Sequence, residues 1–183
     1  MVTRDDLKDG GAAHIVSVMR EIRSFIPEVG CEILVSDFAG KWEPVKLLLD
    51  EKPEVFAHNL ETVRSLVPRV RCQATYERSL SLLTKIKKER PEQVTKSGLM
   101  LGLGESKEQV FEAIEDLAQA RVDMITIGQY LRPTPKQLAV KEFIHPDLFV
   151  EYDQKAKESG IQDVMVGPFV RSSYAARPLR RKE

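Results

Sequence analysis

Short apolar runs of the strand type alternate with amphipathic helical stretches along almost the whole chain. A helical face covers residues 12–26, the strand-like run 31–36 follows it, and the alternation then recurs to residue 166. Such alternation favours a parallel β-sheet with right-handed crossovers, either open and doubly wound or curled into a barrel, and periodicity does not choose between them. The predicted strands are 31–36, a run near Val55, 94–101, 124–127 and 163–166, and the predicted helices are 12–26, 45–49, 76–88, 107–120 and 146–159.

The composition predicts one soluble, cytoplasmic domain. A chain of 183 residues with 42% hydrophobic residues is long enough to bury one sizeable core. Its 28 basic and 28 acidic residues balance, which gives no overall field for nucleic acid or an anionic membrane, and no apolar run approaches the roughly 20 residues of a membrane span. The two cysteines, Cys31 and Cys72, match neither a disulfide scaffold nor a metal-binding spacing.

Polar residues follow several of the predicted strands directly. In both candidate architectures ligands bind at the carboxyl ends of the strands. Four groups of residues fall at such ends: Ser36-Asp37, His58-Asn59, Gly102–Glu105 and Gln129-Tyr130. We therefore expect a binding site on that rim of the sheet.

Two glycine motifs each have a functional and a structural interpretation. Asp9-Gly10-Gly11 precedes the first helix, where glycines allow close approach of a ligand and exposed amides favour an anion, although a Gly-Gly pair is most often a turn. Gly102–Ser106 could cradle a phosphate, but it lacks the complete dinucleotide-binding or P-loop pattern. A capping box formed by Ser106 and Gln109 is the preferred interpretation of this second motif.

His58, Asn59 and Glu61 offer hydrogen-bond donors and an acceptor for a ribose or an amino-acid group. A metal site is not indicated, because a single histidine without a second ligand at a suitable spacing is more often a hydrogen-bonded structural residue. His14 and His145 lie on or beside predicted helix starts and are interpreted as surface or capping residues.

Two further segments are polar and lie near predicted strand ends. In Gly128–Thr134, the polar side chains are expected at the same rim, although packing explains the tyrosine about as well as binding does. Arg171-Ser172-Ser173-Tyr174 has the composition of a polar turn, since serine is a poor iron ligand compared with thiolate.

Together, five segments resemble the lipoyl synthases, which are radical S-adenosylmethionine (SAM) enzymes. The resemblance runs from about residue 2 to residue 176. It implies an α/β fold, a parallel-sheet partial (β/α) barrel of the radical SAM type that lacks its first strand or strands. We expect this domain to cover residues 1–176, and the polar, basic composition of 177–183 predicts a frayed tail. The segments are Asp5-Asp6-Leu7-Lys8-Asp9-Gly10-Gly11-Ala12, residues 55–63, 95–105 and 128–133, and Arg171-Ser172-Ser173-Tyr174-Ala175.

The resemblance implies insertion of two sulfur atoms at C6 and C8 of an octanoyl group on a carrier-protein lysine, with SAM and two 4Fe-4S clusters as cofactors. It also assigns roles to residues of this chain. Ser173 would be a ligand of the auxiliary 4Fe-4S cluster, and Gln129, Tyr130 and Arg132 would face the substrate. The SAM-binding residues would be Gly10, Gly11, Asn59, Glu61, Arg71 and Lys96.

The chain departs from the family in its cysteines. The family's radical cluster needs a Cys-x-x-x-Cys-x-x-Cys loop and its auxiliary cluster needs three further cysteines, and Cys31 and Cys72 match none of these positions. We expect both to be incidental, one buried and one exposed. We also expect a missing amino-terminal segment or a partner chain that supplies it, an unpaired sheet edge, and no activity from this chain alone.

Two alternatives do not require that enzyme activity. The first is a non-catalytic module that binds the carrier protein or the cofactor. The second, independent of the resemblance, is a small α/β protein that binds a phosphorylated ligand at Gly102–Ser106.

Overall fold

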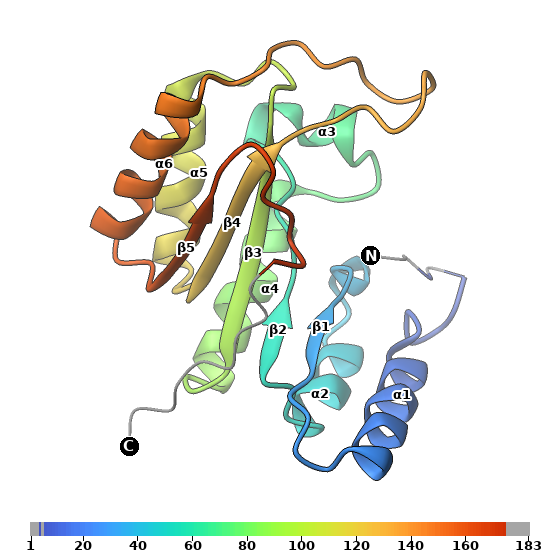
Figure 1. Cartoon of the computed structure of the whole chain (residues 1–183). Helices are drawn as coiled ribbons and strands as arrows, with labels where there is room; N and C mark the ends of the chain where they lie inside the picture. The colour runs from blue at the N-terminus through green and yellow to red at the C-terminus, as the bar shows by residue number, and fades with distance from the viewer. Residues whose placement is uncertain (1–3, 5, 175–183) are drawn as a thin grey trace.

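The computed structural model describes Arg4 and residues 6–174. Within them, five strands form one parallel sheet in the order of the sequence (Figure 1). The tail expected at 177–183, and residues 175–176 of the expected domain, lie outside the described residues. The strands are β1 (Glu32–Leu34), β2 (Val55–Ala57), β3 (Val94–Leu101), β4 (Met124–Gln129) and β5 (Asp163–Val166).

Helices connect the strands close to the predicted positions. Helix α3 and the 3-10 turns η1 (Phe38–Gly40) and η2 (Arg64–Leu66) were not predicted, because three or four residues are too few to show a helical period. The helices are α1 (Ala12–Phe25), α2 (Glu43–Asp50), α3 (Val67–Val70), α4 (Tyr76–Glu89), α5 (Lys107–Gln119) and α6 (Pro146–Glu158).

The strand order decides between the two predicted architectures. Every connection moves one place in the same direction across the sheet. Right-handed crossovers of this kind put all the connecting helices on one face, whereas a doubly wound sheet reverses its order and is covered on both faces. In Figure 1 the helices accordingly lie behind and beside the sheet. The expectation of a partial barrel is confirmed.

The first strand is shorter than the predicted run 31–36. After Leu34, the side chains of Ser36 and Asp37 accept hydrogen bonds from backbone amides of the following turn, so these amides do not pair with a neighbouring strand. The Ser36 hydroxyl accepts from the Phe38 amide at 3.2 Å, and the Asp37 carboxylate accepts from the Ala39 amide at 3.1 Å. Such local bonds compete with strand pairing and turn the chain into η1.

The core lies between the sheet and its helices, in two clusters. Leu99 and Ile127 of β3 and β4 pack with residues of α5 and α6, and Phe56 of β2 packs with residues of α1 and α2. Because side chains alternate along a strand, Lys96, Gly98 and Met100 of β3 face the other way. We call that side the open face.

The chain after β5 turns back across the open face (Figure 1). The Gly167 amide donates to the Ile127 carbonyl at 3.0 Å, and the Lys96 ammonium donates to the Tyr174 carbonyl at 3.2 Å. Residues 167–174 are called the C-terminal segment below. None of the described helices is long and apolar enough to cross a membrane.

Candidate functional site

A cavity of about 160 Å³ opens on the open face at the carboxyl ends of β2, β3 and β4. This is the rim that the sequence predicted. The cavity brings Asn59, Glu61 and Gln129 together with Arg171 and Ser172 of the C-terminal segment. Seven other predicted site residues are not among those that line the cavity: Gly10, Gly11, Arg71, Lys96, Tyr130, Arg132 and Ser173.

Two glycines give the cavity its floor. A Cβ at Gly98 would stand 2.9 Å from Thr126 Oγ1 and 3.0 Å from Asn59 Oδ1. A Cβ at Gly128 would stand 2.2 Å from the Val170 carbonyl oxygen. Any larger residue at either position would fill the space or displace the groups that line it.

Glu61 is the acidic group of the cavity. Its backbone bridges to β3, since the Glu61 amide donates to the Gly98 carbonyl at 2.9 Å and the Glu61 carbonyl accepts from the Met100 amide at 2.8 Å. A positive φ of 71° accompanies this bridge. Burial raises the pKa of Glu61, although the Asn59 side chain and the Arg71 charge act in the opposite direction. A ligand that donates hydrogen bonds to this carboxylate would offset the cost of removing its charge from water.

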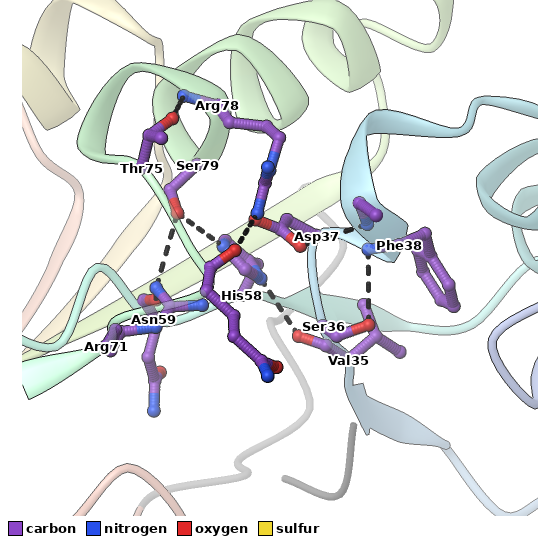
Figure 2. A network of polar contacts seen from close by, with 12 residues as sticks. Val35, Ser36, Asp37, Phe38, His58, Asn59, Arg71, Thr75, Arg78 and Ser79 are labelled. Atoms are coloured by element: carbon purple, nitrogen blue, oxygen red, sulfur yellow. Dashed lines mark hydrogen bonds and ion pairs between the residues drawn. The ribbon is translucent and has the colours of Figure 1, made fainter. Parts of the chain in front are cut away.

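His58 lies behind the cavity and is fully buried. Its Nδ1 is 2.9 Å from the Val35 carbonyl and its Nε2 is 2.9 Å from Ser79 Oγ (Figure 2). A carbonyl only accepts, so Nδ1 carries the proton and Nε2 accepts from the serine hydroxyl. Burial is the main cause that lowers the pKa of His58 to about 4. The predicted structural, hydrogen-bonded histidine is confirmed.

Arg71 connects this network to the cavity. Its Nη1 donates to the Asn59 carbonyl at 3.0 Å and to Ser79 Oγ at 3.3 Å (Figure 2). The guanidinium therefore fixes the backbone of a cavity residue from behind. Its predicted direct contact with SAM stays a prediction.

An ion pair ties the loop after β1 to α4. Arg78 Nε donates to the buried carboxylate of Asp37 at 2.6 Å (Figure 2). The same loop meets the amino-terminal glycines, because a Cβ at Gly10 would stand 2.6 Å from the Phe38 ring. The loop after β1 therefore packs under the start of α1.

The amides at the start of α1 are bonded within the chain, which favours the structural interpretation of Asp9-Gly10-Gly11 over an anion site. Asp9 accepts from the Gly11 amide at 3.0 Å and from the Ala13 amide at 2.9 Å. These bonds lower the pKa of the Asp9 carboxyl. The aspartate satisfies the helix start itself. The assignment of Gly10 and Gly11 to SAM stays a prediction that rests on close approach.

The loop 102–106 forms the predicted capping box. The Gln109 amide donates to Ser106 Oγ at 3.3 Å, and the Ser106 amide donates to the Gln109 side chain at 2.9 Å. The Glu105 carboxylate also accepts from the Leu103 amide at 2.9 Å and from the Gly102 amide. A carboxylate already occupies the position that a phosphate would need.

Gln129, Tyr130 and Arg132 hold the loop that follows β4. The Gln129 side-chain amide donates to three backbone carbonyls and accepts from the Ile144 amide at 2.9 Å. The Tyr130 hydroxyl donates to the Leu138 carbonyl at 2.9 Å, and Arg132 Nε donates to the Gln137 carbonyl at 2.9 Å. Packing and loop closure account for all three side chains, and their contact with a substrate stays a prediction.

The cysteines and the other histidines lie where the sequence predicted. Cys31 is buried and Cys72 is exposed. His14 is exposed on α1, and His145 caps α6 by accepting from the Asp147 amide at 3.4 Å. Ser173 is exposed in the C-terminal segment. The described residues contain no group of three His, Cys, Asp or Glu side chains that could hold a metal.

Sequence reasoning missed Ser79 and Glu32. Ser79 falls in the buried phase of α4 with Tyr76, Leu83 and Ile86, so a polar residue in an apolar phase was its signal. Glu32 is a charged residue at the start of a short strand, between the apolar Cys31 and Ile33, and its Oε1 accepts from the Lys96 ammonium at 2.8 Å. A charge in such a strand predicts a partner on the same face of the sheet.

Comparison with solved structures identifies the architecture. A domain of pyruvate-formate lyase-activating enzyme from Bacteroides vulgatus superposes with a TM-score of 0.67 at 12% identity, covering 91% of this chain and 96% of that one. The radical S-adenosylmethionine methyltransferase TsrM from Kitasatospora setae gives 0.51 at 17% identity, covering 91% of this chain and 31% of that one. At these identities the likeness concerns the fold alone.

No protein-family model matches the chain, but curated relatives do. The lipoyl synthase of Protochlamydia amoebophila is 49% identical over 178 residues, which are 96% of this chain and 55% of that protein. Those of Geobacillus kaustophilus and Bacillus subtilis are 50% and 47% identical over 175 residues, 96% of this chain and 59% of each protein. The chain spans less than two thirds of the length of these relatives. On this identity, which extends over nearly its whole length, the chain is a homologue of these lipoyl synthases and spans little more than half of each.

Proposed function

We propose that this chain contributes the open face of a lipoyl synthase. The complete enzyme would insert two sulfur atoms at C6 and C8 of an octanoyl group on a carrier-protein lysine, in the cytoplasm. Its partners would be octanoylated carrier domains and the segment or chain that provides the missing cysteines. The observation that carries the proposal is the glycine-floored cavity with Asn59 and Glu61, in a chain about half identical to lipoyl synthases.

The residues of the cavity fit a polar portion of SAM. Asn59 offers an amide, Glu61 offers a half-buried carboxylate, and Gly98 leaves room for a ligand between them. A carboxylate in this position would accept from an ammonium or from ribose hydroxyls. The chemistry that SAM supplies when bound with a reduced cluster is radical hydrogen abstraction. The part assigned to this chain is to hold and orient it, and Arg71 and His58 fix the backbone behind the cavity.

The residues present do not fit either 4Fe-4S cluster. Such clusters are held chiefly by cysteine thiolates, and the chain has only two cysteines. One of them, Cys31, is buried at the start of β1, and the other, Cys72, is exposed. We therefore derive no step through a cluster in this chain.

The test is anaerobic iron–sulfur reconstitution of the 183-residue chain, followed by an iron count and a lipoylation assay on an octanoylated carrier domain. We expect a colourless protein and no lipoyl product. Stoichiometric iron together with turnover would contradict our assignment of the cysteines.

A binding module is the second candidate, because the cavity is formed although the thiolates are lacking. Calorimetric titration of the chain with SAM, and separately with an octanoylated carrier domain, tests it. Binding of either one to the chain alone supports this candidate. No binding of either one contradicts it. The phosphate-binding alternative is disfavoured, since Glu105 occupies the loop amides.

A further inference from the structure

The C-terminal segment is attached to the open face at two places. The first is the end of β4, where the Gly167 amide donates to the Ile127 carbonyl at 3.0 Å and the Gln129 amide donates to the Pro168 carbonyl at 3.4 Å. The second is the Lys96 ammonium, which donates to the Tyr174 carbonyl at 3.2 Å. Residues 171–173 lie between these two attachments.

Lys96 is an unusual residue for the middle of a strand. Its side chain is only 1% exposed, and an ammonium buried to this degree needs compensating partners. One partner is Glu32 of β1, whose Oε1 is 2.8 Å from the ammonium nitrogen. The lysine reaches it across β2, where its register partner is the small Ala57. The pair therefore links two strands that are not neighbours.

The pair is not the arrangement that stability alone would favour. Glu32 Oε2 is buried without a hydrogen-bond partner among the described residues. A buried pair with an unsatisfied oxygen is commonly matched or exceeded in stability by apolar residues of the same volume. What an apolar residue cannot provide is the donor that holds the Tyr174 carbonyl.

We propose that Lys96, held by Glu32, is a positioning residue for the C-terminal segment. By fixing the Tyr174 carbonyl it sets the place of Ser173, the neighbouring residue, on the open face. Two of the three ammonium protons are then used within the chain, and the SAM contact predicted for Lys96 stays a prediction. The inference rests on the proposed function only in the cluster-ligand role that the resemblance to lipoyl synthases implies for Ser173.

The test is trypsin cleavage of the native full-length chain after the exposed Arg171, followed by mass spectrometry. The variant is Glu32→Gln/Lys96→Met, which removes both charges together and leaves no lone buried ion. We expect cleavage after Arg171 to accelerate roughly tenfold, since a local opening of the segment becomes easier. Hydrogen exchange in β3 and β4 should stay as in the parent chain. Lys96→Arg, which keeps a cationic donor, should return the cleavage rate to near the parent value.

The matched control is Asp123→Asn/Lys87→Met. This pair is similarly buried, with the Lys87 side chain 8% exposed and the Asp123 side chain 17% exposed, and Lys87 Nζ lies 3.0 Å from Asp123 Oδ2. Its hydrogen bonds reach no residue of the C-terminal segment. We expect it to leave cleavage after Arg171 unchanged. An unchanged rate in the Glu32/Lys96 variant, or an equal acceleration in the control, would overturn the inference. Both readouts use the chain without cofactors, so a failure of the proposed activity would leave the result intact.

Discussion

At the scale of single residues, the buried network behind the cavity determines protonation. His58 is neutral because its two ring nitrogens meet an obligatory acceptor and a hydroxyl in a fully buried position. The pKa of Glu61 shifts in the opposite direction, upward, because burial favours its protonated form. The two side chains therefore give stability a pH dependence of opposite sign.

We predict that His58 makes the chain less stable in mild acid. Its pKa falls from an ordinary 6.5 to about 4 on folding, so between these values the unfolded state binds more protons than the folded state. The contribution of His58 to the free energy of unfolding should be constant above pH 6.5 and should fall by roughly 3 kcal/mol as the pH approaches 4. Urea unfolding across this range, compared with His58→Gln, measures the difference.

The control for this prediction is His14→Gln, which changes an exposed histidine on α1. It should keep the pH dependence of the parent chain, whereas His58→Gln should flatten it. Parallel pH profiles for the parent chain and His58→Gln would show that His58 is not held neutral.

Glu61 carries the second prediction at this scale. Because its pKa is raised on folding, it contributes stability below its ordinary pKa that is lost as the pH rises through the raised value. Glu61→Gln should therefore raise the melting temperature at pH 7.5 and, on the proposed function, weaken SAM binding. A lower melting temperature for Glu61→Gln would contradict our inference that the ionised Glu61 carboxylate destabilises the folded chain.

At the scale of elements, the sequence predicted the regular parts well and the local polar contacts poorly. The ranges of β3 and β5 match the prediction, because a short strand-like run bounded by turn residues defines each of them. The capping box of α5 was also predictable, since Ser106 and Gln109 are close in sequence.

The features that were missed depend either on short local bonds or on contacts between distant residues. The 3-10 turn after β1 forms because Ser36 and Asp37 bond to the local backbone, and Asp37 is held by Arg78 of α4. The route of the C-terminal segment depends on Lys96 and Gly128, far away along the chain. Periodicity reports which face of an element is buried, and it does not report which segment covers the other face.

Gly128 provides a test of that covering segment. A Cβ at Gly128 would lie 2.2 Å from the carbonyl oxygen of Val170 and 3.1 Å from its carbonyl carbon. Both are backbone atoms, so no side-chain rotation can relieve the clash. Gly128→Ala should cost about 1–3 kcal/mol in free energy of unfolding and should speed trypsin cleavage after Arg171. Gly30→Ala is the control, since its Cβ would meet only the Glu54 side chain at 3.4 Å. Equal effects of the two substitutions would contradict the placement of the segment.

At the scale of the whole molecule, the five sequential parallel strands of the described residues place their helices on one face and leave the other face open. That open face collects the cavity, the Glu32–Lys96 pair and the C-terminal segment. Neither cysteine belongs to the cavity lining. The thiolates for the clusters of the proposed enzyme would therefore come from sequence that this chain does not contain.

The most direct test of the account joins this chain to the part of the Bacillus subtilis lipoyl synthase that lies outside the 175 matched residues. The chimera is reconstituted anaerobically and assayed for lipoyl product on an octanoylated carrier domain, with Ser173→Ala as the matched variant. The account predicts product from the chimera and its loss in Ser173→Ala. A folded chimera that holds both clusters, binds SAM and forms no lipoyl product would contradict it.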